Sequence, residues 1–136
     1  MKNFKFLEHT ADIKFQAFGK TKEGAFRNSF FALRESICGG LKIQKKIRKK
    51  IKIKAKDDES LLYNFLEEFL YLLDSENFLI SEIRNIKIIN GNLSAEVFGD
   101  ESKNYDFTNN VKAITYNQMF VKKENEKWVV QVVLDV

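Results

Sequence analysis

The amino-acid sequence predicts one α+β domain over residues 1–136, a two-layer sandwich in which two helices pack on one face of a mostly antiparallel or mixed sheet. Segments with alternating apolar and polar residues, the pattern of half-buried strands, occur before, between and after two segments with helical spacing. No linker or internal repeat divides them, and 136 residues is an ordinary size for one domain. The 44% content of hydrophobic residues, with 13 Phe, provides enough apolar surface for a packed core.

The first expected elements are two short strands followed by a helix. Apolar and polar side chains alternate over residues 4–8 and 13–18, which predicts a strand in each segment. Thr21 is placed to cap the helix that follows, because a threonine oxygen can accept a hydrogen bond from an amide of the first turn. Apolar residues continue at helical spacing to Ile37, and the two glycines at residues 39–40 then end the helix.

A lysine-rich segment follows this helix. Over residues 43–56 lysine alternates with isoleucine or alanine, which predicts a strand with one face on the core and a lysine-covered face in water. Strands that bind nucleic acid usually also present aromatic residues for base stacking, and this segment has none. A solvated sheet face is therefore the favoured interpretation, and an RNA-binding surface around residues 45–56 is the alternative.

A second helix and a hairpin are expected next. Residues 57–60 supply a cap and an acidic first turn, and residues 61–73 form a broad apolar stripe that predicts a well-buried helix. Residues 83–89 and 93–98 have strand patterns on either side of Asn90-Gly91, a pair that tolerates the positive φ of a two-residue hairpin.

The last third of the chain predicts a polar loop and a second pair of strands. The loop covers residues 99–110, and the strands cover residues 111–121 and 127–134 around a turn at residues 124–126. Residues 129–134 are apolar at nearly every position, which predicts a strand that is covered on both faces.

Several classes of chemistry are excluded by missing residues. The chain has one His, His9, and one Cys, Cys38, so a zinc site built from Cys and His cannot form within it. No Gly-rich phosphate loop, nucleophile elbow or dinucleotide fingerprint is present. Cys38 is interpreted as a small buried apolar residue near a helix end, and a thiolate pair with His9 is the less favoured alternative.

Charge and cysteine content bear on compartment and partners. The formal net charge of +4 is weak support for a polyanionic partner, because Lys, Ile, Phe and Asn are abundant and Pro is absent, as in a genome-wide coding bias. A single cysteine and the lack of a basic, then apolar, opening segment favour a reducing cytosol. No apolar run reaches the roughly 20 residues of a membrane helix. A cytoplasmic protein without a membrane partner is expected.

Two carboxylates stand in unusual places. Asp12 interrupts an otherwise apolar segment at the start of the second strand, and Asp135 directly follows the most apolar strand. If the last strand lies beside the first in the sheet, both side chains and the terminal carboxylate of Val136 can converge. Three carboxylates so close repel one another unless a cation lies between them, and oxygen ligands alone suit calcium, magnesium or manganese. Alternatively, Asp12 caps a turn while Asp135 and Val136 extend into solvent, as terminal residues commonly do.

Several separated segments, in the same order, resemble those of the archease family. They are residues 6–15, residues 21–26 and 59–62 at the starts of the two helices, residues 112–116 (Lys-Ala-Ile-Thr-Tyr), and Trp128 with residues 132–136. The resemblance spans essentially the whole chain. One position departs from the family pattern, which usually has His after the Thr-Tyr pair. This sequence has Asn117 there, a side chain that can still accept and donate hydrogen bonds.

The resemblance implies a fold and a set of site residues. Archeases are similar two-layer α+β proteins that bind a divalent cation, and their ligands correspond to Asp12, Asp135 and the C-terminal carboxylate of Val136. Calcium is the cation expected in crystals, with magnesium or manganese as alternatives. Lys112 matches a family position that is required for function. Glu8 and His9 lie in the opening motif beside the site, although from the residues alone His9 is better interpreted as a turn residue bonded to the backbone.

The resemblance also implies a chaperone-like accessory function rather than an enzymatic one. Archeases help the GTP-dependent RNA ligase of tRNA splicing, accelerating guanylylation of the ligase and allowing multiple turnover, and the contact with tRNA is indirect. Two other functions compete with this one. An RNA-binding module would use the lysine-rich strand, and a metal-dependent phosphoester hydrolase would use Asp12 and Asp135.

Overall fold

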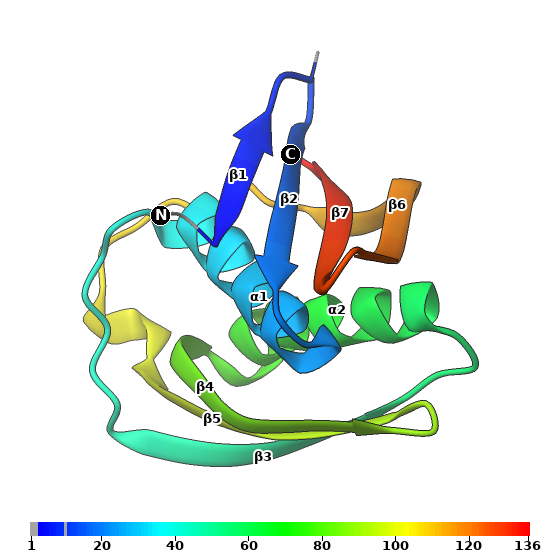
Figure 1. The fold of residues 1–136 in the computed structure, drawn as a ribbon. Helices are drawn as coiled ribbons and strands as arrows, with labels where there is room; N and C mark the ends of the chain where they lie inside the picture. Colours follow the sequence, from blue (N-terminus) through cyan, green and yellow to red (C-terminus); the bar gives the residue numbers. More distant parts are fainter. Residues whose placement is uncertain (1–2, 10) are drawn as a thin grey trace.

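The computed structural model describes residues 3–9 and 11–136 of the chain (Figure 1). These residues form two α-helices, seven β-strands and a short 3-10 helix, Ser102–Asn104. The strands belong to two antiparallel sheets. Thr10, within the opening segment that resembles the archease family, lies outside the described residues.

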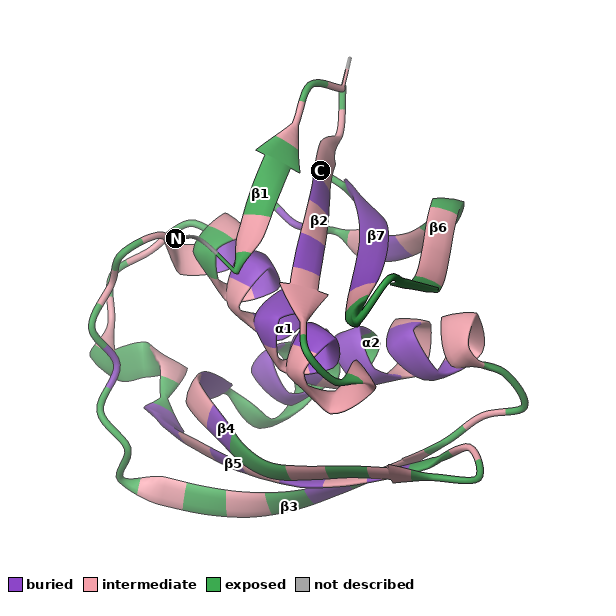
Figure 2. Ribbon diagram, in the orientation of Figure 1, coloured by how far each residue is buried: buried purple, intermediate pink, exposed green. Residues whose placement is uncertain are grey.

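The first sheet has four strands in the order β1-β2-β7-β6. Their bounds are β1 Phe4–Leu7, β2 Ile13–Gly19, β6 Ala113–Glu124 and β7 Lys127–Asp135. The first and last parts of the chain therefore meet in the middle of one sheet, where β2 pairs with β7. Every side chain from Val129 to Leu134 is buried, which confirms the prediction of a strand covered on both faces (Figure 2).

The second sheet has three strands in the order β3-β5-β4. Their bounds are β3 Ile47–Lys54, β4 Phe78–Ile89 and β5 Asn92–Glu101. The predicted hairpin is confirmed between β4 and β5, where Asn90 and Gly91 have φ values of 50° and 76°. Burial alternates along β3, so its isoleucines face the core, and Lys50, Lys52 and Lys54 are exposed on the other face (Figure 2).

The two helices are α1, Lys22–Cys38, and α2, Asp58–Glu76. Both predicted caps are confirmed: the Thr21 hydroxyl accepts a hydrogen bond from the amide of Gly24 at 3.0 Å, and the Asp57 carboxylate accepts one from the amide of Ser60 at 2.7 Å. Within the described residues, neither helix is long and apolar enough to span a membrane.

The helices lie between the two sheets (Figure 1), where the sequence predicted a single sheet with helices on one face. The α+β class and the antiparallel pairing are confirmed, and the division into two sheets is the difference. Its physical reason is the width of the apolar surface on α2, where residues such as Leu62, Phe65 and Leu72 are all buried. Because α2 contacts β6 of one sheet and β4 of the other, both sheets are needed to cover it.

Strand β4 begins earlier than predicted, and β5 ends later. Phe78, Leu79 and Ile80 are buried and belong to β4, which the sequence pattern placed at residues 83–89. The left-handed conformation of Asn77, with φ 53°, ends α2 and turns the chain directly into this strand. Strand β5 continues to Glu101, into the predicted loop at residues 99–110.

Candidate functional site

The register of β2 against β7 brings Asp12 and Asp135 to the same end of the four-stranded sheet. The last pair along these strands is Ile13 opposite Leu134. Asp12 directly precedes Ile13, and Asp135 directly follows Leu134. In an antiparallel pair the next position on each strand is again opposite. The condition set from the sequence was that the last strand lies beside the first, but β7 lies beside the second strand, β2, which directly follows Asp12 (Figure 1).

Asp135 is held by its pairing with a neighbouring strand. It is the last residue of β7 and is opposite Ala113 of β6. Its carbonyl oxygen accepts a hydrogen bond from the amide of Lys112 at 2.7 Å. The side chain of Asp135 is exposed, so an acceptor-only carboxylate is presented to solvent from a fixed backbone.

Asp12 lies beside the only imidazole of the chain. The distance from His9 Nδ1 to Asp12 Oδ2 is 3.5 Å, and the two side chains are 20% and 31% exposed. Nδ1 of His9 is buried, and among the described residues it has no hydrogen-bond partner. Buried polar nitrogens are nearly always satisfied. The predicted hydrogen bond from His9 to backbone is not found there, and the imidazole faces Asp12 instead.

Lys112, Glu8 and Asn117 lie on or next to strands of the same sheet. The backbone bond to Asp135 places Lys112 directly before β6, with its side chain exposed. Glu8 is exposed and directly follows β1. The Asn117 side chain is exposed, and the backbone amide of Asn117 donates to the Thr115 hydroxyl at 3.3 Å. The position at which the family usually has His is thus open to solvent in this chain.

The chemistry of this end of the sheet suits a hard cation. The available groups are the carboxylates of Asp12 and Asp135 and main-chain oxygens near Val136, and oxygen ligands of this kind are preferred by calcium, magnesium and manganese. Across residues 3–9 and 11–136, no three His, Cys, Asp or Glu side chains are grouped as a metal site would require. A cation here would need the terminal carboxylate of Val136 as its third charged ligand, so the set stays a prediction.

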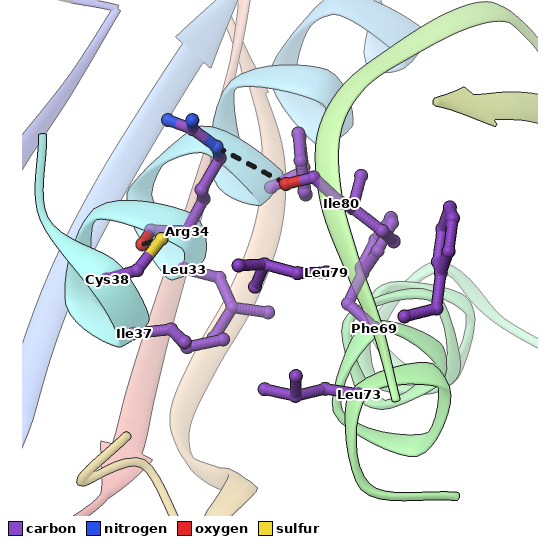
Figure 3. A pocket seen from close by; sticks show the side chains of 10 residues that line it. Leu33, Arg34, Ile37, Cys38, Phe69, Leu73, Leu79 and Ile80 are labelled. Atoms are coloured by element: carbon purple, nitrogen blue, oxygen red, sulfur yellow. Dashed lines mark hydrogen bonds between the residues drawn. The ribbon is translucent and has the colours of Figure 1, made fainter. Parts of the chain in front are cut away.

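Cys38 lies in a different environment. It is half-buried in the last turn of α1, and its thiol donates to the carbonyl of Arg34 at 3.4 Å. Burial raises the pKa of the thiol. With Leu33, Ile37 and Phe69 it lines an apolar pocket between the two helices and β4 (Figure 3). This environment fits the predicted role as a small apolar residue.

A pair of stacked tyrosines was missed in the sequence. Tyr116, in the Lys-Ala-Ile-Thr-Tyr segment, stacks on Tyr63 of α2 with ring centroids 4.4 Å apart and an angle of 5° between the rings. A hydrogen bond with Glu67 is the main cause of the raised pKa of Tyr63. Tyr116 is 53% exposed. An aromatic residue on an otherwise polar stretch of β6 is the one signal that could have indicated it.

Sequence comparisons with known proteins identify a family. The chain matches the sequence model of the Archease protein family (MTH1598/TM1083) over residues 4–136. It is 39% identical to the protein archease of Methanosarcina barkeri, with 99% of this chain and 97% of the relative covered. It is 36% identical to the protein archease of Pyrococcus furiosus, with 100% of both chains covered.

Two solved structures have the same fold. A solution structure of a Methanobacterium thermoautotrophicum protein is 30% identical and has a TM-score of 0.85, with 100% of both chains covered. The crystal structure of an archease from Thermotoga maritima, described as a possible chaperone, is 20% identical and has a TM-score of 0.69. The match covers 97% of this chain and 96% of the Thermotoga maritima chain. From the family match and the full-length identity to its relatives, it follows that this chain belongs to the archease family.

Proposed function

We propose that this protein is a non-enzymatic activator of the GTP-dependent RNA ligase of tRNA splicing. It promotes guanylylation of the ligase, and hence its multiple turnover, through a divalent cation bound by Asp12, Asp135 and the terminal carboxylate of Val136. The observation that carries the proposal is the pairing of Ile13 with Leu134, which brings the two aspartates to one end of a sheet. Membership in the archease family supports it independently.

The charge balance at this end of the sheet supports a bound cation. Asp12 and Asp135 would be opposite one another in the extended register, and like charges that are directly opposite destabilise a sheet. The cation offsets this repulsion and gains acceptor-only oxygen ligands. The pairing of Asp135 with Ala113 and the backbone hydrogen bond from Lys112 hold the Asp135 backbone in place, which reduces the entropy lost on binding. Calcium, magnesium and manganese are the candidate cations.

The neighbouring residues have separate tasks in this proposal. The exposed Lys112 ammonium contacts a phosphate of the nucleotide or a carboxylate of the ligase, because charge-assisted hydrogen bonds are strong and orient their partners. His9 positions Asp12 from a distance of 3.5 Å. Glu8 extends the acidic surface that enters the cleft of the ligase. When bound, the cation offsets negative charge near the nucleotide phosphates.

This accessory role fits the residues that the chain has. One His and one Cys offer little support for acid-base or nucleophilic chemistry, so the bond-making groups belong to the ligase. The protein contacts tRNA through the ligase complex and acts in the cytoplasm. The Thermotoga maritima archease, described as a possible chaperone, fits the same general picture of a protein that acts on a partner protein.

Guanylylation of the ligase tests the proposal directly. Ligase is incubated with labelled GTP, the cation and either wild-type protein, Asp12→Asn or Asp135→Asn, and the label transferred to the ligase is measured. Each variant should activate the ligase about tenfold less or worse, the scale on which changes around a metal site act. Glu126→Gln is the control, because this exposed acid lies in the β6–β7 turn at the opposite end of the same sheet.

Full activation by both aspartate variants would overturn the proposal. A loss of activation by Glu126→Gln of equal size would overturn it too, because general acidity of the sheet, and not the carboxylate end, would then be responsible. Melting curves of the three variants identify any that are simply unfolded.

A further inference from the structure

The outer face of the three-stranded sheet carries a row of lysines that the proposed function does not use. Side chains alternate along a strand, so the exposed lysines of β3, green in Figure 2, lie on the face opposite its more buried isoleucines. Lys87 of β4 is exposed on the same face, because Lys87 and Lys52 are both opposite Ser94 of β5. We call the surface made by Lys50, Lys52, Lys54 and Lys87 the lysine face.

The sheet register groups these lysines toward the β4–β5 hairpin. Lys52 is opposite Ser94, and Ser94 is opposite Lys87, so two ammonium groups flank one hydroxyl across three strands. Lys54 occupies the next row, opposite Asn92. Lysines two apart on β3 are separated by about 6.6 Å along the strand. The positive charges are therefore spaced in a row at this end of the sheet and do not converge on one point.

The acids of this sheet are engaged elsewhere. Glu96 is bonded to the Arg48 guanidinium at 3.0 and 3.2 Å, and Glu82 is bonded to Arg84 at 2.7 Å and to Lys45 at 3.2 Å. Within the part of the chain that the structure describes, Lys52, Lys54 and Lys87 form no ion pair. The hairpin half of the sheet thus carries lysines without an acidic partner, whereas Glu82 and Glu96 both lie among the cations of the other half.

A surface hollow lies at the same place. Its volume is about 390 Å³, and its lining includes Lys52, Lys54, Lys87, Ser94, Asn92 and Ile89. Three flexible ammonium groups and a hydroxyl can reach into it, and each can donate hydrogen bonds to anionic oxygens. A partner that matches this surface must carry several separated negative charges.

We propose that the lysine face binds the phosphate backbone of RNA without regard to sequence. Evenly spaced phosphates complement evenly spaced lysines, and the release of condensed counterions provides the driving force. Phe98, an aromatic of β5 on this face, lies under the Arg84 guanidinium at 4.7 Å, which leaves it unavailable for base stacking. Backbone contacts therefore dominate. This inference rests on the proposed function only for the identity of the polyanion, since the ligase acts on RNA.

The structure changes the interpretation that the sequence favoured for residues 45–56. The solvated face predicted there is present, because the lysines do face water. What the sequence could not show is that Lys87 from a distant strand joins them, and that the nearby acids are bonded to other residues. The predicted alternative, an RNA-binding surface, gains its support from these two features.

Binding to a fluorescent stem-loop RNA, measured by anisotropy without ligase over a range of KCl concentrations, tests the inference. The variant is Lys52→Gln/Lys54→Gln/Lys87→Gln. The matched control is Lys122→Gln/Lys123→Gln/Lys127→Gln, which removes the same number of charges from exposed positions near the β6–β7 turn of the other sheet. We expect the face variant to bind RNA about tenfold or more weakly, with a salt slope reduced by about two to three. The control should bind nearly as wild type.

Equal losses in the face variant and the control would overturn the inference, since net charge alone would then explain binding. No RNA binding by the wild type at low salt would overturn it as well. So would binding to vesicles of anionic phospholipid that exceeds binding to RNA.

The failure of this inference is distinguishable from failure of the proposed function. Guanylylation of the ligase requires no RNA, so the face variant should support it as well as wild type does. If Asp12→Asn and Asp135→Asn activate the ligase fully but the face variant loses RNA binding, only the ligase proposal fails. If the face variant binds RNA normally while the aspartate variants are inactive, only the RNA inference fails.

Discussion

The two sheets of this protein gather charge in different ways. The four-stranded sheet brings Asp12 and Asp135, near the two ends of the chain, to one end of a strand pair. The three-stranded sheet spreads Lys52, Lys54 and Lys87 over an open face. The first arrangement depends on a long-range strand pairing and the second mainly on alternation within one strand. Charged residues that are distant in sequence are thus brought together by strand topology, whereas charges spread along one face follow from the local alternation of side chains.

The two regions should also respond differently to substitution. In a small carboxylate site each ligand is a large part of the total charge, so one substitution should remove most of the binding. On the lysine face each ammonium contacts a different phosphate, so losses should accumulate with the number of lysines changed. One substitution should therefore remove cation binding at the carboxylate site, whereas RNA binding by the lysine face should weaken with each lysine that is replaced.

The largest expected effect comes from a change in the helical core that supports both sheets. Phe65 of α2 is fully buried and packs against Phe26 and Phe69, with ring centroids 5.7 and 5.0 Å away. Phe65→Ala should lower the free energy of unfolding by about 3–5 kcal/mol, because a large cavity opens between the two sheets. Guanidinium unfolding followed by fluorescence or circular dichroism measures this.

Cation binding and RNA binding should then melt together in Phe65→Ala protein as temperature rises. An exposed aromatic provides the control: Tyr71 of α2 is 53% exposed, and Tyr71→Ala should change stability by less than about 0.5 kcal/mol. If the two binding activities were lost at separate temperatures, the helices would not be the common support of both sheets.

A smaller effect is expected from a change that is confined to the three-stranded sheet and the loop after it. Asp100, buried near the end of β5, accepts hydrogen bonds from the Tyr105 hydroxyl and the Glu101 amide, both at 2.8 Å. The bond from Tyr105 is the largest cause of the lowered pKa of this carboxyl. A carboxyl with a lowered pKa stabilises the fold above its unfolded pKa of about 3.9, and this contribution is lost as pH falls through the folded pKa.

Asp100→Asn should therefore lower the melting temperature at pH 7, and the difference from wild type should shrink below about pH 4. Melting curves from pH 3 to pH 7 measure it. Asp106→Asn serves as the control, since Asp106 is exposed in the following loop. A difference that stays constant over the whole range would show that the carboxylate charge of Asp100 does not contribute.

Sequence periodicity was enough for most of the elements. The caps at Thr21 and Asp57, the Asn90-Gly91 hairpin and the buried last strand are set by local chemistry, and all are confirmed. The division into two sheets was not predicted, because a broad apolar stripe on α2 reveals that it is buried but not that strands lie on two sides of it. Early strand residues such as Phe78 were missed for a related reason, since a short apolar run next to a helix has no distinctive period.

The candidate site was predicted only conditionally. That Asp12 and Asp135 stand in unusual places is visible in the sequence, but their proximity depends on β7 lying next to β2, which strand order alone decides. The contact of Asp12 with His9 and the stacking of Tyr116 on Tyr63 depend on loop and helix placement that alternation does not encode. Lys87 joined the lysine face for the same reason, through its register with Ser94.

The most direct measurement of the central claim is calorimetric titration of the protein with Ca²⁺ and with Mn²⁺. Wild type and Glu126→Gln should each bind one ion. Asp12→Asn, Asp135→Asn and a chain lengthened by two glycines after Val136 should each bind it about tenfold or more weakly, because each loses or displaces one charged oxygen ligand. Equal ion affinity in wild type and the Asp135→Asn protein would contradict the account.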